Sequence, residues 1–260
     1  MRVTTLASSS SGNCVLLSSG DAHILIDVGI SLRRVRSALF RVGLTPDDIG
    51  AVLVTHSHSD HINGIPALAE RVRSRIYATS ETLDIIVPNM PPRSELELIS
   101  PGVEFSVRDM SVRAFATSHD APGSVGYAIE AAGRKFVLAT DLGIVTPEVL
   151  KAARGANVAV IEANHDREML WKGAYPYMIK RRIASDVGHL SNEAGGGLAL
   201  SLAEAGAGTL ILAHLSTENN TPELALKTVG DVLSSGGASV GKDVGLYIAP
   251  RVGAGDTYEV

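Results

Sequence analysis

Cysteine is almost absent from this sequence, because Cys14 is the only one among 260 residues. A single cysteine excludes an internal disulfide and a thiolate-rich metal site, and it fits a reducing compartment. Long apolar runs are absent too, since no segment approaches the roughly 20 apolar residues of a membrane span. The first residues, MRVTTLASSSSG, lack the continuous apolar stretch of a signal peptide. These absences predict a soluble cytoplasmic protein with no membrane partner.

Positive charge is also scarce, because 23 Lys and Arg stand against 28 Asp and Glu, for a formal net charge of −5. This balance argues against a general attraction to nucleic acid, so any such binding would need a local basic patch. Hydrophobic residues make up 45% of the chain and glycine is plentiful, which is typical of a globular protein. The chain is long enough to bury a substantial core. No linker, repeat or low-complexity tract interrupts it, so we expect a single domain over residues 1–260.

Short apolar runs alternate with helical patterns along the chain. The runs at 13–18 and 23–28, separated by SGDA, predict a β-hairpin. Apolar residues at helical spacing after Ser31 predict a helix that ends near Gly43. Further strands are expected at 51–55, 75–80, 103–107, 111–117, 125–131, 134–140, 157–162 and 209–216, and further helices at 66–74, 80–87, 146–153, 192–205 and 221–235. Residues 88–101 hold four of the eleven prolines and are expected to be irregular. Strand groups at both ends, each followed by helices, predict an α/β protein with two face-to-face sheets and helices outside.

The segment THSHSDH carries an unusual density of metal-binding side chains. It follows the buried run AVLV and places His56, His58, Asp60 and His61 within six positions. In an extended loop, residues two apart point the same way, so His56 and His58 can converge on one point. Asp60 and His61 lie where the chain turns into a helix and would face a second point. Imidazole and carboxylate together suit zinc, manganese or iron, and the absence of thiolates disfavours a structural zinc.

Three other candidate ligands follow apolar runs later in the chain. His119 follows SVRAFATS, Asp141 follows RKFVLAT, and His214 follows TLILA. Each alone could be an ordinary loop-end residue or a helix cap. Their shared placement at the carboxyl ends of strands predicts that they complete the metal site.

With these motifs in order, the sequence resembles the metallo-β-lactamase fold superfamily. The resemblance implies a four-layer αβ/βα sandwich with two divalent metal ions in its cleft and a metal-bridging water as the nucleophile. It assigns His56, His58 and His119 to one metal, Asp60, His61 and His214 to the other, and Asp141 to both, so that Asp60 and Asp141 are catalytic as well as ligands. Asp27 in LIDVG matches the aspartate that orients the ligand loop in this superfamily.

Within the superfamily, the chain is similar to small bacterial nucleases of the YycJ/WalJ type. SSSSGNC, THSHSDHINGI, HDAPGSVGY, EANHDREML, GAYPYMIKRRI and GHLSN carry this resemblance. It implies a DNA exonuclease that acts 5′ to 3′ and a catalytic pair, Glu162 and His189, that helps to protonate the leaving oxygen. The chain is too short for the large cap domain of the RNA-cleaving relatives, so we expect no inserted cap domain. Ser191 and Asn192, at the start of a predicted helix, are candidate phosphate contacts.

The run around KRR offers a local basic edge, with Lys180 and Arg181 as candidate substrate contacts and a solvated surface as the alternative.

Two other functions remain open at this point. One is hydrolysis of a small ester, thioester or lactam, with Glu162 and His189 merely structural. The other is a metal-binding sensor or DNA-binding protein without turnover. The ligand types do not distinguish zinc, manganese and iron, and the oligomeric state is not indicated.

Overall fold

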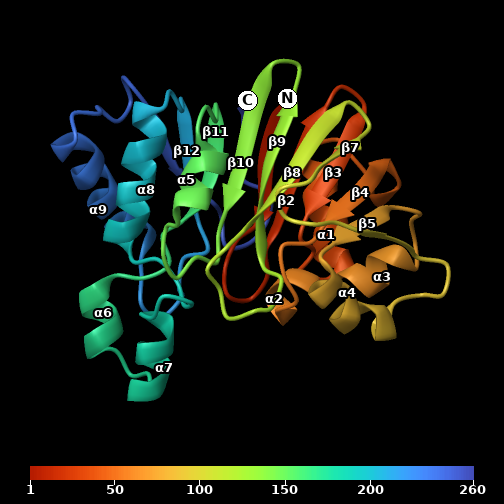
Figure 1. Ribbon diagram of the computed structural model, residues 1–260, viewed down its shortest axis with the longest axis horizontal. Helices are drawn as coiled ribbons and strands as arrows, with labels where there is room; N and C mark the ends of the chain where they lie inside the picture. Colours follow the sequence, from red (N-terminus) through yellow and green to blue (C-terminus); the bar gives the residue numbers. More distant parts are fainter.

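The computed structural model describes residues 1–260 and contains two seven-stranded β-sheets (Figure 1). The first sheet has the order β14-β1-β2-β3-β4-β5-β6 and the second β13-β12-β11-β10-β9-β8-β7. The strands of the first sheet are β1 (Arg2–Ala7), β2 (Cys14–Ser19), β3 (Ala22–Ile26), β4 (Ile49–Leu53), β5 (Arg75–Ala78), β6 (Glu95–Leu98) and β14 (Thr257–Glu259). Those of the second are β7 (Glu104–Val107), β8 (Met110–Ala116), β9 (Val125–Ala131), β10 (Arg134–Ala139), β11 (Val158–Glu162), β12 (Thr209–Ala213) and β13 (Gly245–Ile248).

Helices cover the outer face of each sheet. The helices are α1 (Leu32–Arg41), η1 (Pro46–Asp48), α2 (Ser59–Ile62), α3 (Ile65–Ala69), α4 (Ser80–Ile86), η2 (Val87–Asn89), α5 (Pro147–Ala153), α6 (Arg167–Lys172), α7 (Tyr177–Ile183), α8 (Asn192–Glu204) and α9 (Pro222–Ser235). Helices α1, α3 and α4 lie against the first sheet, and α5, α8 and α9 against the second (Figure 1). None of these helices is long and apolar enough to cross a membrane.

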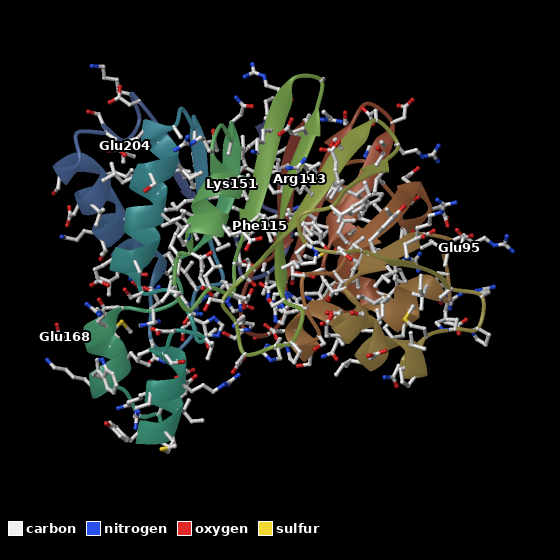
Figure 2. The ribbon with its side chains drawn as sticks, viewed as in Figure 1. Glu95, Arg113, Phe115, Lys151, Glu168 and Glu204 are labelled. Atoms are coloured by element: carbon white, nitrogen blue, oxygen red, sulfur yellow. The ribbon has the colours of Figure 1, made fainter.

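Three apolar clusters separate the four layers. The central cluster joins the inner faces of the two sheets and includes the fully buried Tyr127 and Phe136. A second cluster lies between the second sheet and its helices, where Phe115 of β8 packs near α5 (Figure 2). The third lies between the first sheet and its helices and includes Leu39. Successive residues of a strand belong alternately to the central cluster and to an outer cluster, as Val15 and Leu16 of β2 do, which confirms the four-layer αβ/βα sandwich.

Several elements differ from the sequence prediction. Residues 95–98 form the edge strand β6 rather than an irregular segment, because the alternating ELEL pairs in parallel with β5. Helix α3 is shorter than the expected helix over 66–74. The sequence patterns did not predict β1, β13 and β14, which pair within the two sheets. They also did not predict α6 and α7, which project beyond the sheets below α8 in Figure 1.

Candidate metal centre

The histidine loop is held by backbone hydrogen bonds to the segment after β3. Val28 N donates to His61 O at 2.8 Å, and Gly64 N donates to Val28 O at 2.7 Å. The backbones approach so closely that a Cβ on Gly29 would lie 1.6 Å from the Asp60 carbonyl oxygen. Only glycine fits at this position. The glycine of LIDVG therefore sets the position of the loop that carries the candidate ligands.

The structure brings His56, His58 and His119 together at one point. Their ligand atoms all lie within 4.8 Å of one another, and His58 Nδ1 faces His119 Nε2 across 3.2 Å. Two ligands about 2.1 Å from one tetrahedral ion are about 3.4 Å apart. The spacing of these imidazoles therefore fits a shared cation.

A second group forms beside the first. Asp60 Oδ2 lies 3.4 Å from His61 Nε2 and 3.5 Å from His214 Nε2. Asp141 connects the two groups, because its Oδ2 lies 3.6 Å from His61 Nε2 and its Oδ1 lies 3.9 Å from His119 Nε2. The seven residues expected to hold metal thus converge from positions 56 to 214.

Three buried polar atoms in these groups have no hydrogen-bond partner: His56 Nε2, Asp141 Oδ2 and His214 Nε2. An unpaired buried polar atom costs about 1–3 kcal/mol, so such atoms are rare without a compensating ligand. All three belong to the candidate ligand set and are of the types that bind zinc, manganese or iron. The residues present therefore fit divalent cations.

The charges in this buried space favour added positive charge. Burial opposes charge on His61, yet the neighbouring Asp141 and Asp27 raise the pKa of its imidazole to about 10. Burial likewise opposes charge on His214, but Asp141 and Asp60 raise its pKa well above the usual range. The carboxylates at this place are therefore balanced either by imidazolium protons or by divalent cations, and cation binding would release protons.

Backbone strain is concentrated at the same place. Five residues other than glycine have positive φ: Asp27 (59°), Arg108 (56°), Ala132 (52°), Asp141 (59°) and His214 (56°). Arg108 and Ala132 lie in hairpin turns, whereas the other three lie one or two positions after β3, β10 and β12, each of which pairs in parallel with a neighbouring strand. Such conformations cost of order 1 kcal/mol each and collect at functional sites. The tight turns aim these three side chains into the space between the sheets' carboxyl ends.

The structure joins Glu162 to both His189 and His214. Glu162 Oε1 accepts from His189 Nδ1 at 2.8 Å and from His214 Nδ1 at 2.9 Å. Its Oε2 accepts from the backbone N–H groups of Leu142 and Leu190. Burial opposes its charge, but His189 and His214 hold the pKa of Glu162 at about 2. Because Glu162 is 0% exposed, its carboxylate orients the two imidazoles and does not face a substrate.

Ser191 and Asn192 make internal contacts instead of facing the cleft. Ser191 Oγ caps α8 by accepting from Ala194 N at 3.3 Å. The Asn192 amide is fully buried and exchanges two hydrogen bonds with Asn220, at 3.0 and 2.8 Å. The Asn192 side chain is therefore directed at Asn220, and phosphate contact through the backbone N–H groups at the start of α8 stays a prediction.

The basic residues of α7 have different environments. Lys180 Nζ donates to Trp171 O at 2.8 Å and to Gly173 O at 2.7 Å, so it ties α7 to the end of α6. Lys180 therefore has internal partners, and its contact with substrate stays a prediction. Arg181 is exposed.

Two residues at the centre were not singled out from the sequence. Asp120 Oδ1 lies 3.6 Å from both His58 Nε2 and His119 Nε2, while its Oδ2 pairs with Arg182. Asn13 Nδ2 lies 3.1 Å from Asp60 Oδ2. The adjacency of Asp120 to His119 in the chain was a signal for the first. Asn13 belongs to the SSSSGNC motif and lies just before β2, at the same end of the sheet as the ligand loop, where its backbone N donates to Asp60 O at 2.8 Å.

Comparison with known proteins gives one family. A family model described as "Beta-lactamase superfamily domain" matches residues 22–215. Exodeoxyribonuclease YycJ of Bacillus anthracis is 37% identical over 248 residues, which are 93% of this chain and 92% of the relative. Exodeoxyribonuclease WalJ of Streptococcus pneumoniae serotype 2 (strain D39 / NCTC 7466) is 34% identical over 250 residues, which are 95% and 93% of the two chains.

A solved structure shows the same fold. The metallo-beta-lactamase fold protein YhfI from Bacillus subtilis superposes with a TM-score of 0.76 at 18% identity. The superposition covers 99% of this chain and 98% of that chain. At this identity the likeness concerns the arrangement of sheets and helices.

Proposed function

This chain belongs to the β-lactamase superfamily, and from that premise we propose that it is a dinuclear metal-dependent phosphodiesterase, a DNA exonuclease acting from 5′ ends. One observation carries the proposal: Glu162 holds His189 2.8 Å away, beside Asp141 of the candidate metal centre. The relatives named exodeoxyribonucleases cover nearly the whole chain and support the choice of DNA.

The chemistry divides between cations and side chains. Two divalent cations held by His56, His58, His119, Asp60, His61 and His214, with Asp141 shared, would lower the pKa of bound water and neutralise charge on a phosphate. Zinc and manganese both suit this donor set.

His189 is placed to move a proton. Its Nδ1 is bound to Glu162, which leaves Nε2 free on a side chain that is 19% exposed. With Nδ1 held by Glu162, Nε2 is the ring nitrogen through which His189 can pass a proton to the leaving oxygen of a phosphodiester. Glu162 acts through His189 and His214, as a positioning residue. Asp27 fixes the ring of His61 in the same way.

The direct test uses DNA labelled separately at its 5′ and 3′ ends. Protein loaded with manganese or zinc should release labelled mononucleotide at once from the 5′-labelled strand, and shorten the 3′-labelled strand stepwise. His58→Ala, which removes one imidazole of the first group, should abolish both. Equal release by wild type and His58→Ala would assign the activity to a contaminant and overturn the proposal.

A parallel assay distinguishes this proposal from hydrolysis of a small ester, thioester or lactam. Wild type and His58→Ala are given a phosphodiester chromogen, a thioester and a chromogenic lactam. Cleavage of the phosphodiester together with DNA supports the proposal. Metal-dependent cleavage of the thioester or lactam without any action on DNA would replace it.

A further inference from the structure

Helices α6 and α7 form a short arm that is rich in both aromatic and basic residues. Three of the chain's eleven Phe, Trp and Tyr residues, namely Trp171, Tyr175 and Tyr177, lie within seven positions of this arm. Residues 167–183 contain five Lys and Arg against one Glu, a net charge of +4 in a chain of −5. The arm is therefore a local basic patch on an otherwise acidic protein.

Apolar side chains on the arm are unusually exposed. Trp171 is 46% exposed, Tyr177 65% and Met178 72%. The rings of Trp171 and Tyr177 are neighbours, with centroids 6.2 Å apart and planes tilted by 45°. Because the rings are not stacked on each other, each can offer a face to a flat ligand. Lys180 fixes the turn between the helices through its bonds to Trp171 O and Gly173 O.

Some basic side chains of the arm have no ion-pair partner. Lys172 pairs with Glu168, which lies on the outer side of α6 (Figure 2), and Arg182 pairs with Asp120. Arg167 and Arg181 are exposed and have no acidic partner. These two guanidinium groups can bind phosphate without first breaking an ion pair.

The base of the arm touches the candidate metal centre. Arg182 pairs with Asp120, which lies 3.6 Å from His58 and His119. The Ile183 carbonyl accepts from His189 N at 2.9 Å. Tyr177 lies six residues before Ile183, about 9 Å along the helix axis. That length corresponds to roughly three stacked nucleotides.

We propose that the α6–α7 arm binds single-stranded nucleic acid next to the scissile bond, with a base stacked on Trp171 or Tyr177 and phosphates paired with Arg167 and Arg181. The proposal rests on the phosphodiesterase function and names the form of its substrate. Stacking needs an unpaired base, and aromatic rings beside free cations bind single strands with little sequence preference.

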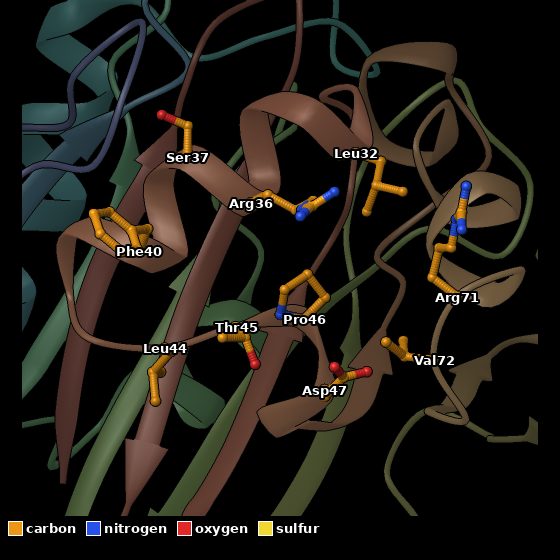
Figure 3. A pocket seen from close by; sticks show the side chains of 10 residues that line it. All are labelled: Leu32, Arg36, Ser37, Phe40, Leu44, Thr45, Pro46, Asp47, Arg71 and Val72. Atoms are coloured by element: carbon orange, nitrogen blue, oxygen red, sulfur yellow. The ribbon is translucent and has the colours of Figure 1, made fainter.

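Another exposed aromatic residue lies beside basic side chains but away from the candidate metal centre. Phe40 of α1 is 80% exposed and lines a surface cavity of about 630 Å³ with Arg36 and Arg71 (Figure 3). The cavity contains none of the candidate metal ligands. Phe40→Ala is therefore a matched control for loss of an exposed ring.

Trp171 is the only tryptophan, so its fluorescence reports on the arm directly. The metal-loaded full chain is titrated with a phosphorothioate-linked thymidine 12-mer, which resists cleavage, and with the matching uridine 12-mer. We expect at least the thymidine 12-mer to quench the fluorescence of Trp171. Tyr177→Ala should bind this oligonucleotide about 10-fold more weakly, whereas Tyr177→Phe and Phe40→Ala should bind it as wild type does. Arg181→Ala should lower the slope of log affinity against log salt by about 0.7.

Activity separates the two proposals. Tyr177→Ala should raise KM for a 12-mer about 10-fold and leave cleavage of a small phosphodiester chromogen unchanged. Cleavage of the 12-mer with wild-type KM would overturn the arm proposal and leave the phosphodiesterase proposal intact. Tight, Tyr177-dependent binding without hydrolysis would support the arm proposal and overturn the phosphodiesterase proposal. A dimer that Tyr177→Ala dissociates, with no change in oligonucleotide binding, would assign the arm to contact between two copies and overturn its role in nucleic acid binding.

Discussion

Asp27 Oδ2 lies 2.7 Å from His61 Nδ1, although 34 positions separate the two residues in the chain. The same carboxylate accepts from Thr55 N and Thr55 Oγ1, both at 2.8 Å. The contact holds the proton of His61 on Nδ1 and leaves Nε2 to face Asp60 and Asp141. One buried aspartate therefore sets the tautomer and the direction of a candidate metal ligand.

Asp27→Asn should weaken metal binding by about 10- to 100-fold, because the amide cannot offer the same charge to His61. Asn tolerates the positive φ at this position, so the backbone should not change. Competition with a coloured chelator measures the affinity. The control is Asp21→Asn in the exposed β2–β3 turn. Equal affinity in Asp27→Asn and wild type would show that this contact does not orient a ligand.

His189→Ala should keep its metal and lose about 10²- to 10⁴-fold in kcat, the range expected for a missing proton donor. Glu162→Gln should lower both metal content and kcat, since the carboxylate orients His214 as well as His189. Metal analysis beside kinetics separates the two variants. Loss of metal in His189→Ala would identify His189 as a ligand.

His165 should make the fold sensitive to acid. Burial lowers the pKa of His165 to about 4 from its usual 6.5, so the native state holds it neutral. As pH falls from 6.5 to 4, the unfolded chain takes up a proton that the folded chain does not. This residue should therefore reduce the free energy of unfolding by roughly 3 kcal/mol across that window.

Urea unfolding of wild type and His165→Gln at several pH values measures this effect. The variant should lose less stability between pH 6.5 and 4 than wild type does. The decrease in the free energy of unfolding of His165→Gln at pH 7.5 gives the packing contribution of the His165 side chain, which is independent of titration. Parallel curves for the two proteins below pH 6.5 would contradict the assignment.

Cys14 should be inert in the native protein. The thiol is 0% exposed on β2, and burial together with Asp27 raises its pKa far above the usual range. A thiol reagent at pH 8 should therefore modify one equivalent only after unfolding, because the thiolate is the reacting form. Rapid modification in the absence of denaturant would show that β2 opens locally.

Periodicity identified most elements of this fold, since strands and helices with one buried face leave a pattern in the sequence. Periodicity did not identify the short edge strands, which are held by pairing with a neighbouring strand rather than by burial of one face. Residues 95–98 alternate charged and apolar side chains at an edge, and β14 is three residues long. Helices α6 and α7 expose apolar side chains instead of burying them, so no amphipathic spacing marked them.

Local spacing was enough to indicate a metal site, because His56, His58, Asp60 and His61 share one short loop. Strand ends also indicated His119, Asp141 and His214, since parallel strands deliver their carboxyl ends to one edge. The resemblance already paired Glu162 with His189, whereas folding alone revealed that Glu162 also binds His214 and that Asn192 is turned toward Asn220. These pairs are 27 to 52 positions apart. The direction of each side chain depends on the packing of two sheets, which no stretch of neighbouring residues encodes.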